Sequence, residues 1–305
     1  MYELLIIGGG PAGVAAGVYA ARKKIKAILI TESFGGQSVT SAGIENWIGA
    51  KSISGYDLSK MLEEHLRAQG GIEIIEGDLV SAIKKTDGGF SVETKNGKKL
   101  ETKFILLAAG SGRRKLGVPG EKEFEGRGVF YCSTCDAPLM KGKVAAVVGG
   151  GNAGLEAVHD LLPYAEKIYL LIRSEGMKGD PVTQEKIKAS PKVEIITHAL
   201  TREILGKEFI TGLKYKNSQT GEETEIITEG VFVEIGAVPN SYLVKDFVKL
   251  NDRGEIIVDH KTQQTPDPGI WAVGDVTDVL YKQNNISAGD AVKAVLNVYE
   301  HLRTH

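Results

Sequence analysis

Cysteine is scarce in this chain, because Cys132 and Cys135 are the only two among 305 residues. A framework of several disulfides is therefore excluded. The sequence also lacks any run of about 18 apolar residues, so no segment is predicted to span a membrane. Its N-terminus enters a strand almost at once, without the charged and small-residue elements of a signal peptide, and we expect a cytoplasmic protein.

Neither sign of charge is in excess, since the formal net charge is −2 and charged residues make up 25% of the chain. No surplus of Lys and Arg is available to hold nucleic acid through its phosphates, and a chain that is 42% hydrophobic is not disordered. The length predicts one large or two medium domains. Glycine is abundant, with 38 residues against a usual share of about 7%.

Many of these glycines belong to two copies of one motif. Residues 3–7 form an apolar run, Gly8–Gly13 read G-x-G-x-x-G, and residues 14–22 are rich in alanine. In a strand–turn–helix of this kind, the first glycine permits the turn and the second admits a pyrophosphate at the helix N-terminus. The third lets the helix pack close to the strand. The context favours dinucleotide binding over a purely structural turn.

The second copy, Gly149–Gly154, follows a predicted strand over residues 144–148 and precedes a predicted helix over residues 155–162. Two copies predict two dinucleotide sites, or the duplication of a binding domain.

The residue that ends the next strand of each copy selects the nucleotide. In the first copy this strand covers residues 27–30, and the acid is expected at Thr31. Glu32 stands one place later, where it either reaches a ribose or faces solvent.

In the second copy the strand covers residues 167–172, and Ile172 stands in place of an acid. Arg173, Ser174 and Lys178 follow, a set that suits a 2′-phosphate and favours NADPH over NADH. Two solvated basic residues are the competing interpretation.

Cys132 and Cys135 form a C-x-x-C motif that is followed by Asp136. Zinc would need about four ligands, and no third cysteine exists, so no metal is expected. A structural disulfide here would close too short a loop to constrain the unfolded chain. We predict a redox dithiol, with Asp136 as a proton carrier, a helix cap or both.

Two dinucleotide sites and a dithiol together predict a path for electrons. NAD(P)H gives two electrons as hydride, a dithiol takes up two electrons per disulfide, and a flavin is the usual carrier between them. One fingerprint should therefore hold FAD and the other NAD(P)H.

With these features the chain resembles a known family, the low-molecular-weight thioredoxin reductases of the pyridine nucleotide–disulfide oxidoreductases, over essentially its full length. Six further motifs carry the resemblance. They are Gly35–Gln37 (GGQ), Ile44–Gly49 (similar to IENYPG), Ala108–Gly110 (similar to ATG), Gly236–Asn240 (similar to GxxPN), Trp271–Asp275, and Lys282–Gln283 with Ala288–Gly289 (similar to RQ…AAG).

The resemblance implies an α/β fold with two Rossmann-like domains of the three-layer ββα type, the second inserted into the first. Residues 1–113 and 246–305 would bind FAD, and residues 114–245 would bind NAD(P)H and carry the dithiol. Two linkers, 113–119 and 240–245, would let the domains rotate. The implied protein is a homodimer in which Cys135 faces the flavin and Cys132 attacks a thioredoxin or a similar small redox protein.

The motifs also imply the residues of the two sites. The FAD residues would be Gly8, Gly10, Pro11, Ala12, Gly13, Glu32, Gly36, Gln37, Asn46, Ala109, Gly110, Gly274, Asp275, Lys282, Gln283 and Ala288. The NAD(P)H residues would be Gly149, Gly151, Asn152, Ala153, Gly154, Glu156, Arg173, Ser174, Lys178 and Gly236. The catalytic residues would be Cys132, Cys135 and Asp136.

The chain departs from the family pattern where the second nucleotide is selected. Typical members have HRRxxxR, of which this sequence keeps one Arg, with Ser174 for the second and Lys178 for the third. The run Met177–Asp180 and the C-terminal third are similar to the flavoprotein subunit of alkyl hydroperoxide reductase, which uses NADH. An NADH-dependent reductase of a peroxiredoxin or glutaredoxin-like partner is therefore the alternative, as is a relative that takes electrons from another donor.

Overall fold

The structure, a computed structural model, describes residues 1–41 and 43–304. Ala42 and His305, which fall in the ranges predicted to bind FAD, lie outside the described residues. The chain divides into two compact units. The first unit comprises Met1–Val39, Asn46–Gly112 and Val238–His305, and the second comprises Thr40–Glu45 and Arg113–Ala237.

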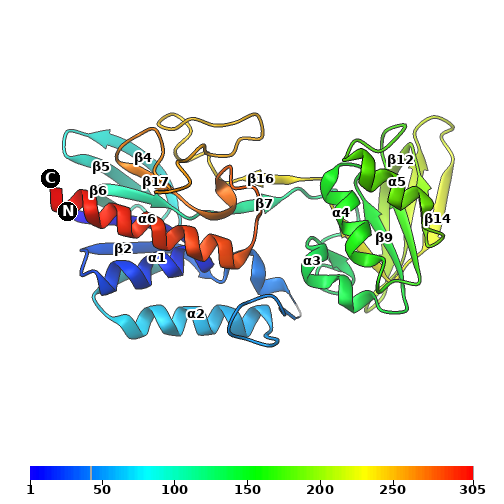
Figure 1. Ribbon diagram of the computed structural model, residues 1–305, viewed down its shortest axis with the longest axis horizontal. Coiled ribbons are helices and arrows are strands. Elements are labelled where there is room, and N and C mark those ends of the chain that lie inside the picture. Colours follow the sequence, from blue (N-terminus) through cyan, green and yellow to red (C-terminus); the bar gives the residue numbers. More distant parts are fainter. Residues whose placement is uncertain (42, 305) are drawn as a thin grey trace. The chain divides into compact units, whose positions relative to one another are not determined.

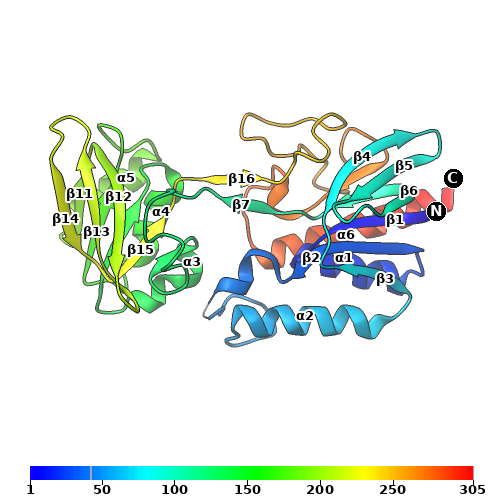
Figure 2. The ribbon, with the colours of Figure 1, turned by 180° about the vertical axis from the view of Figure 1, so that it is seen from behind.

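The first unit is built on one sheet of strand order β3-β2-β1-β6-β5-β4, with β17 paired to β6 (Figures 1 and 2). Strands β1, β2, β3, β6 and β17 run parallel, and β4 and β5 are antiparallel additions. The strands are β1 (Tyr2–Gly9), β2 (Ala27–Phe34), β3 (Ile72–Glu76), β4 (Val80–Thr86), β5 (Gly89–Thr94), β6 (Lys99–Leu107) and β17 (Ile270–Ala272).

Three helices of this unit, α1 (Pro11–Arg22), α2 (Gly55–Gln69) and α6 (Asn284–Thr304), lie side by side along the sheet in Figure 1. The alternation of strand side chains explains how β1 is covered on both faces. Leu5 and Ile7 join a core that includes Val92 of β5, while Leu4 and Ile6 are buried on the opposite face. Helix α1 contacts β1 directly.

The second unit repeats this plan with a parallel sheet of order β11-β10-β9-β15-β8 and a separate antiparallel sheet of order β12-β13-β14. The parallel strands are β8 (Val129–Phe130), β9 (Val144–Val148), β10 (Lys167–Leu171), β11 (Val193–Ile196) and β15 (Gly230–Val233). The antiparallel strands are β12 (Ala199–Gly206), β13 (Ile210–Asn217) and β14 (Glu223–Ile227). The helices are α3 (Ser133–Asp136), α4 (Asn152–Leu161) and α5 (Pro181–Ala189).

Strand β9 shows why the second unit has three layers. Ala145 and Val147 pack with residues of α4 and α5, whereas Ala146 and Val148 pack with residues of β12, β13 and β14. A strand that is apolar on both faces has to be covered twice. Each unit therefore has helices on one face of a parallel sheet and antiparallel strands on the other. The predicted fold class is confirmed: two Rossmann-like domains of the three-layer ββα type, the second inserted into the first.

Two of the connections between the units lie close to the predicted linkers. At these connections the chain passes between the units at Gly112/Arg113 and at Ala237/Val238, where β7 (Ser111–Arg113) pairs with β16 (Ala237–Pro239). Residues 240–245, predicted as the second linker, belong to the first unit because Val244 is fully buried in its core. Residues 116 and 117 are also fixed, since their N–H groups donate to the buried Glu121 carboxylate.

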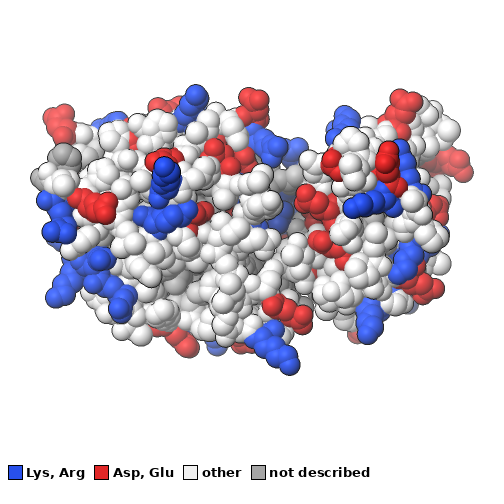
Figure 3. Space-filling model, in the orientation of Figure 1, with Lys and Arg blue, Asp and Glu red and all other residues white. Residues whose placement is uncertain are grey.

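On the face drawn in Figure 3, blue Lys and Arg side chains are interspersed with red Asp and Glu side chains. Among residues 1–41 and 43–304, no helix is both long enough and apolar enough to span a membrane.

The burial of Trp271 generates a prediction about stability. Trp271 is fully buried, its indole N–H donates to Asn297 Oδ1 at 3.0 Å, and its ring packs edge-on against Phe104. Trp271→Ala should lower the free energy of unfolding by about 3–5 kcal/mol, because the cavity cannot be refilled. Urea denaturation measures the change. Tyr56→Ala, at a side chain that is 57% exposed, is the control, and equal losses in the two variants would contradict the prediction.

Candidate functional site

The first unit contains a cavity of about 410 Å³ at the carboxyl ends of β1, β2, β6 and β17. This edge of a parallel sheet is where open α/β folds bind ligands. Of the residues predicted to bind FAD, the lining includes Gly8, Gly10, Pro11, Ala12, Glu32, Gly36, Gln37, Ala109, Gly110, Gly274 and Asp275. These residues lie far apart in the sequence, and the sheet brings them together.

The glycines of the first fingerprint divide into two roles. A Cβ at Gly13 would lie 1.8 Å from Gly8 O, so Gly13 packs against the strand end and does not line the cavity. A Cβ at Gly10 would meet only Gly36 Cα, at 3.8 Å. Gly10 lines the cavity in front of the N-terminus of α1, and its missing side chain leaves room there for a pyrophosphate. The residues present fit the phosphates of FAD.

Four other predicted FAD residues are also absent from the described lining: Asn46, Lys282, Gln283 and Ala288. Lys282 instead forms an ion pair with Glu255 at 3.0 Å and donates to Thr277 O. Asn46 and Gln283 bond to each other, with Asn46 Nδ2 donating to Gln283 Oε1 at 3.3 Å. Ser287, the neighbour of Ala288, does line the cavity.

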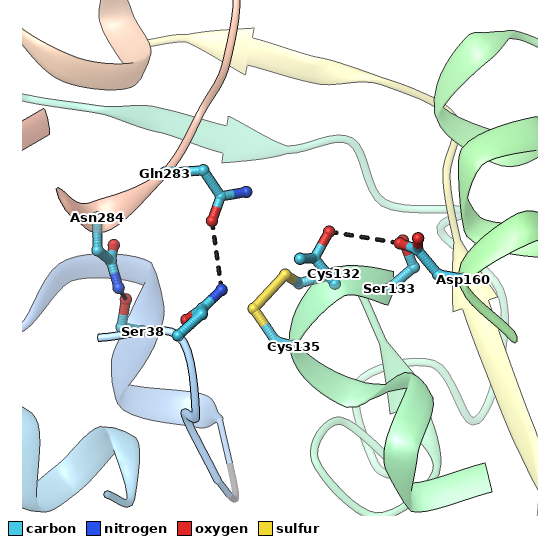
Figure 4. Close-up of a disulfide and its surroundings, with 9 residues drawn as sticks. Ser38, Cys132, Ser133, Cys135, Asp160, Gln283 and Asn284 are labelled. Carbon is cyan, nitrogen blue, oxygen red and sulfur yellow. Dashed lines mark hydrogen bonds between the residues drawn. A yellow bond between two sulfur atoms is a disulfide. The ribbon is translucent and has the colours of Figure 1, made fainter. Parts of the chain in front are cut away.

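Sequence reasoning missed several lining residues. Asn240 donates through Nδ2 to Ala109 O at 2.8 Å and so holds the end of β6 in place. Asn240 stands in the GxxPN-like turn, and that motif is the sequence signal that could have identified it as a lining residue. Ser38 and Asn284 also line the cavity and bond to each other at 2.8 Å (Figure 4). Nothing in a short motif predicts that pair, because its members are brought together only by the tertiary fold.

The second fingerprint has the same local geometry in the second unit. A Cβ at Gly154 would lie 2.0 Å from Gly149 O, and one at Gly149 would lie 2.2 Å from Glu234 O. Gly151, just before α4, has open space where a Cβ would be. Asn152 and Ala153, also predicted to bind the nucleotide, begin α4, and Asn152 Oδ1 accepts the Asp180 N–H at 2.8 Å. The residues present fit the phosphates of a pyridine nucleotide.

The selector region lies beside this turn. Ile172 is 1% exposed and packs over Gly150, so no acid occupies the end of β10. Lys178 N–H donates to Gly150 O at 2.7 Å, which ties the following loop to the fingerprint. The side chains of Arg173 and Lys178 are exposed, while Ser174 Oγ donates to Gly176 O at 2.9 Å. Glu156 is exposed on α4, and Gly236 has a φ of +103° in the turn after β15.

Cys132 and Cys135 form a disulfide at the start of α3, with their Cα atoms 5.4 Å apart (Figure 4). Both cysteines are partly exposed, whereas Asp136 on the same turn is 6% exposed. Burial raises the pKa of Asp136 from 3.8 to about 7. Its carboxyl caps neither α3 nor the short helix that follows, Ala137–Met140. A buried acid that titrates near neutrality is suited to carry a proton beside the dithiol.

Two further carboxylates near the dithiol were missed by sequence reasoning. Asp160 Oδ2 accepts a hydrogen bond from Ser133 Oγ at 2.8 Å. Glu234 is 8% exposed, and burial raises its pKa to about 7, opposed by the charge of Arg113 and by the backbone N–H of Ser133. No motif contains Asp160, and Glu234 stands just before the GxxPN-like turn. Among the described residues, no group of three or more His, Cys, Asp or Glu side chains has the arrangement of a metal site.

The raised pKa of Asp136 predicts a pH dependence of stability. Its folded pKa lies above its ordinary value, so the folded state binds the proton more tightly, and stability is lost as the pH rises from about 4 to 7. Asp136→Asn should be as stable as the wild type at pH 4 and more stable at pH 8, by about 4 kcal/mol. Urea denaturation across this range measures the difference. The exposed Asp252→Asn is the control, and a gap that does not change with pH would contradict the assignment.

Comparison with known proteins agrees with this geometry. The model of the pyridine nucleotide-disulphide oxidoreductase family matches residues 2–294. An alkyl hydroperoxide reductase subunit of Pseudomonas putida is 45% identical over 304 residues, which are 99% of this chain and 58% of that protein. The chain thus spans about three fifths of the length of this curated relative.

Solved structures give the same family. Thioredoxin reductase from Streptococcus pyogenes matches with a TM-score of 0.91 and 33% identity, covering 100% of this chain and 99% of that one. Thioredoxin reductase from Giardia duodenalis matches with a TM-score of 0.89 and 29% identity, covering 99% of each chain. With two dinucleotide turns and a C-x-x-C disulfide in a fold shared over its whole length, the chain belongs to the pyridine nucleotide-disulphide oxidoreductase family.

Proposed function

We propose that this protein is an FAD-dependent disulfide reductase that takes electrons from NAD(P)H and delivers them to thioredoxin or a similar small redox protein. The observation that carries the proposal is the partly exposed Cys132–Cys135 disulfide with the buried Asp136 on the same turn. Family membership implies FAD and a pyridine nucleotide. The first unit is proposed to bind FAD and the second to bind NAD(P)H.

The side chains of the dithiol turn would have separate roles in reduction and transfer. Reduction breaks the bond between the two sulfurs, and two electrons with two protons yield two thiols. Asp136, whose pKa is about 7, can supply or accept one of these protons. The Cys132 thiolate would then attack the partner disulfide and form a mixed disulfide, which Cys135 resolves. FAD, when bound, would supply the two-electron relay between hydride and disulfide.

In the first unit, the chain's own residues would hold and orient the flavin nucleotide. The N-terminus of α1 and the part of the cavity lined by Gly10 and Gly36 would take the pyrophosphate. Glu32 and Asp275 line the same cavity, where their carboxylates could accept hydrogen bonds from ribose and ribitol hydroxyls.

Replacement of one cysteine tests the proposed path. Cys135→Ser should retain flavin reduction by the nucleotide and lose thioredoxin reduction by at least about a thousandfold, because a single thiol cannot release the partner as a dithiol. Stopped-flow flavin absorbance and a coupled thioredoxin assay measure the two steps separately. The wild-type protein with NADPH, thioredoxin and a disulfide reporter is the control. Normal turnover by the variant, or none by the wild type with any donor and any thioredoxin-like partner, would refute the proposal.

The preferred nucleotide is proposed to be NADPH, on the basis of Ile172, Arg173 and Lys178. Arg173→Ala should raise the KM for NADPH about tenfold and leave that for NADH unchanged, because only the 2′-phosphate bonds the guanidinium. Initial rates of flavin reduction measure both constants. Lys207→Ala, at an exposed lysine of the second unit, is the matched control. Equal KM changes for both nucleotides, or a wild type that prefers NADH, would reverse the assignment.

A second candidate function is an NADH-dependent reductase of a peroxiredoxin or glutaredoxin-like partner. The observation that favours it is the 45% identity to the alkyl hydroperoxide reductase protein of Pseudomonas putida. The incomplete set of cations after β10 is compatible with NADH. A screen of small redox partners with each nucleotide separates this function from the first. A homodimeric state is proposed on the family resemblance, and a cytoplasmic location is proposed as well.

A further inference from the structure

The two residues between the cysteines are held from one side by a carboxylate. Asp160, on the last turn of α4, accepts Ser133 Oγ at 2.8 Å and Thr134 Oγ1 at 3.4 Å through the same oxygen, Oδ2. Figure 4 shows Asp160 behind the turn, with Ser133 pointing toward it and the disulfide on the other side. Ser133 is 8% exposed, so this contact is largely removed from water. A hydrogen bond to a charged acceptor in such a place contributes more than an exposed one.

A second carboxylate approaches the same turn. Glu234, directly after β15, interacts with the backbone N–H of Ser133. Its own backbone is fixed, because Glu234 N–H donates to Val148 O at 2.9 Å, and its carbonyl lies against Gly149. The dithiol turn is therefore anchored to two elements that also build the second fingerprint, namely α4 and the strand ends beside Gly149.

The ionisable groups placed near the dithiol turn are mostly carboxyl groups. Asp136 on α3, Asp160 and Glu156 on α4, and Glu234 after β15 face this region, and Arg113 at the end of β7 is the cation that acts on Glu234. A negative charge near a thiol disfavours the thiolate and raises the pKa of that thiol. Disfavouring the thiolate destabilises the reduced form, which makes a dithiol a stronger reductant.

We propose that Asp160 is a positioning residue for the Cys132–Cys135 dithiol: its bond to Ser133 fixes the turn, and its charge keeps the pair strongly reducing. The inference rests on the proposed function, since it assumes that the pair cycles between disulfide and dithiol. Asp160 acts through Ser133, and its proposed role requires no contact with a sulfur atom or with the nucleotide. The negative charge of Asp160 makes the dithiol a stronger reductant and so favours electron delivery to a partner disulfide.

Asp160→Asn tests the charge, because an amide oxygen can still accept the Ser133 hydroxyl. In protein reduced with dithiothreitol and freed of it, the rate of iodoacetamide alkylation against pH gives the pKa of the more reactive thiol. We expect the variant to lower this pKa by roughly one unit. Equilibration with glutathione at a pH above the pKa of this thiol in the wild type should show the disulfide to be about tenfold easier to reduce, which corresponds to about 30 mV for a two-electron couple.

Two further variants keep the test specific. Ser133→Ala removes the hydrogen bond and leaves the carboxylate, so it should leave the thiol pKa closer to that of the wild type than Asp160→Asn does, while slowing transfer to the partner. Glu166→Gln removes an exposed carboxylate of the same unit and should change neither quantity. An Asp160→Asn profile that coincides with those of the wild type and Glu166→Gln would overturn the inference. Because alkylation uses no nucleotide or partner, this readout fails or succeeds independently of the turnover assays.

Discussion

The close approach of a helix to the end of a strand is the constraint on which both sites depend. Gly13 and Gly154 each sit where a Cβ would lie about 2 Å from a carbonyl oxygen, that of Gly8 and that of Gly149. Any side chain there would push the helix away from the sheet. With glycine, the N-terminus of the helix reaches the carboxyl edge of the parallel strands, and its free N–H groups and dipole can meet a phosphate.

In the second unit the same constraint also organises the redox chemistry. The carbonyl that presses on Gly149 belongs to Glu234, whose carboxyl interacts with the turn of the dithiol, and the helix that starts at Asn152 ends at Leu161, beside Asp160. The nucleotide turn and the dithiol turn therefore share their supports. Asp136 and Glu234 are both buried, and burial raises their pKa values toward neutrality. Proton transfer at pH 7 is most effective for groups with such pKa values.

The differences between expectation and structure have physical reasons. The predicted linker 240–245 contains polar residues, but Val244 among them is buried, and burial depends on partners that are distant in sequence. Lys282 is predicted to lie at the flavin because a motif places a cation there, and the structure pairs its ammonium group with Glu255, a contact that no motif indicates. Asn46 and Gln283 satisfy each other's amides, a pairing across more than two hundred residues that only folding creates.

The sequence by itself determined the local pieces: two strand–glycine–helix turns, the C-x-x-C pair with Asp136, and the order of the motifs that identify the family. The turns and the C-x-x-C pair are readable because each depends on backbone geometry or chemistry within one short segment, and the order of the motifs is a property of the sequence itself. Tertiary structure alone decided which residues share a cavity, where the chain crosses between units, and that Asp160 and Glu234 stand behind the dithiol. Burial and carboxylate pKa values follow from neighbours far along the chain, so no local pattern carries them.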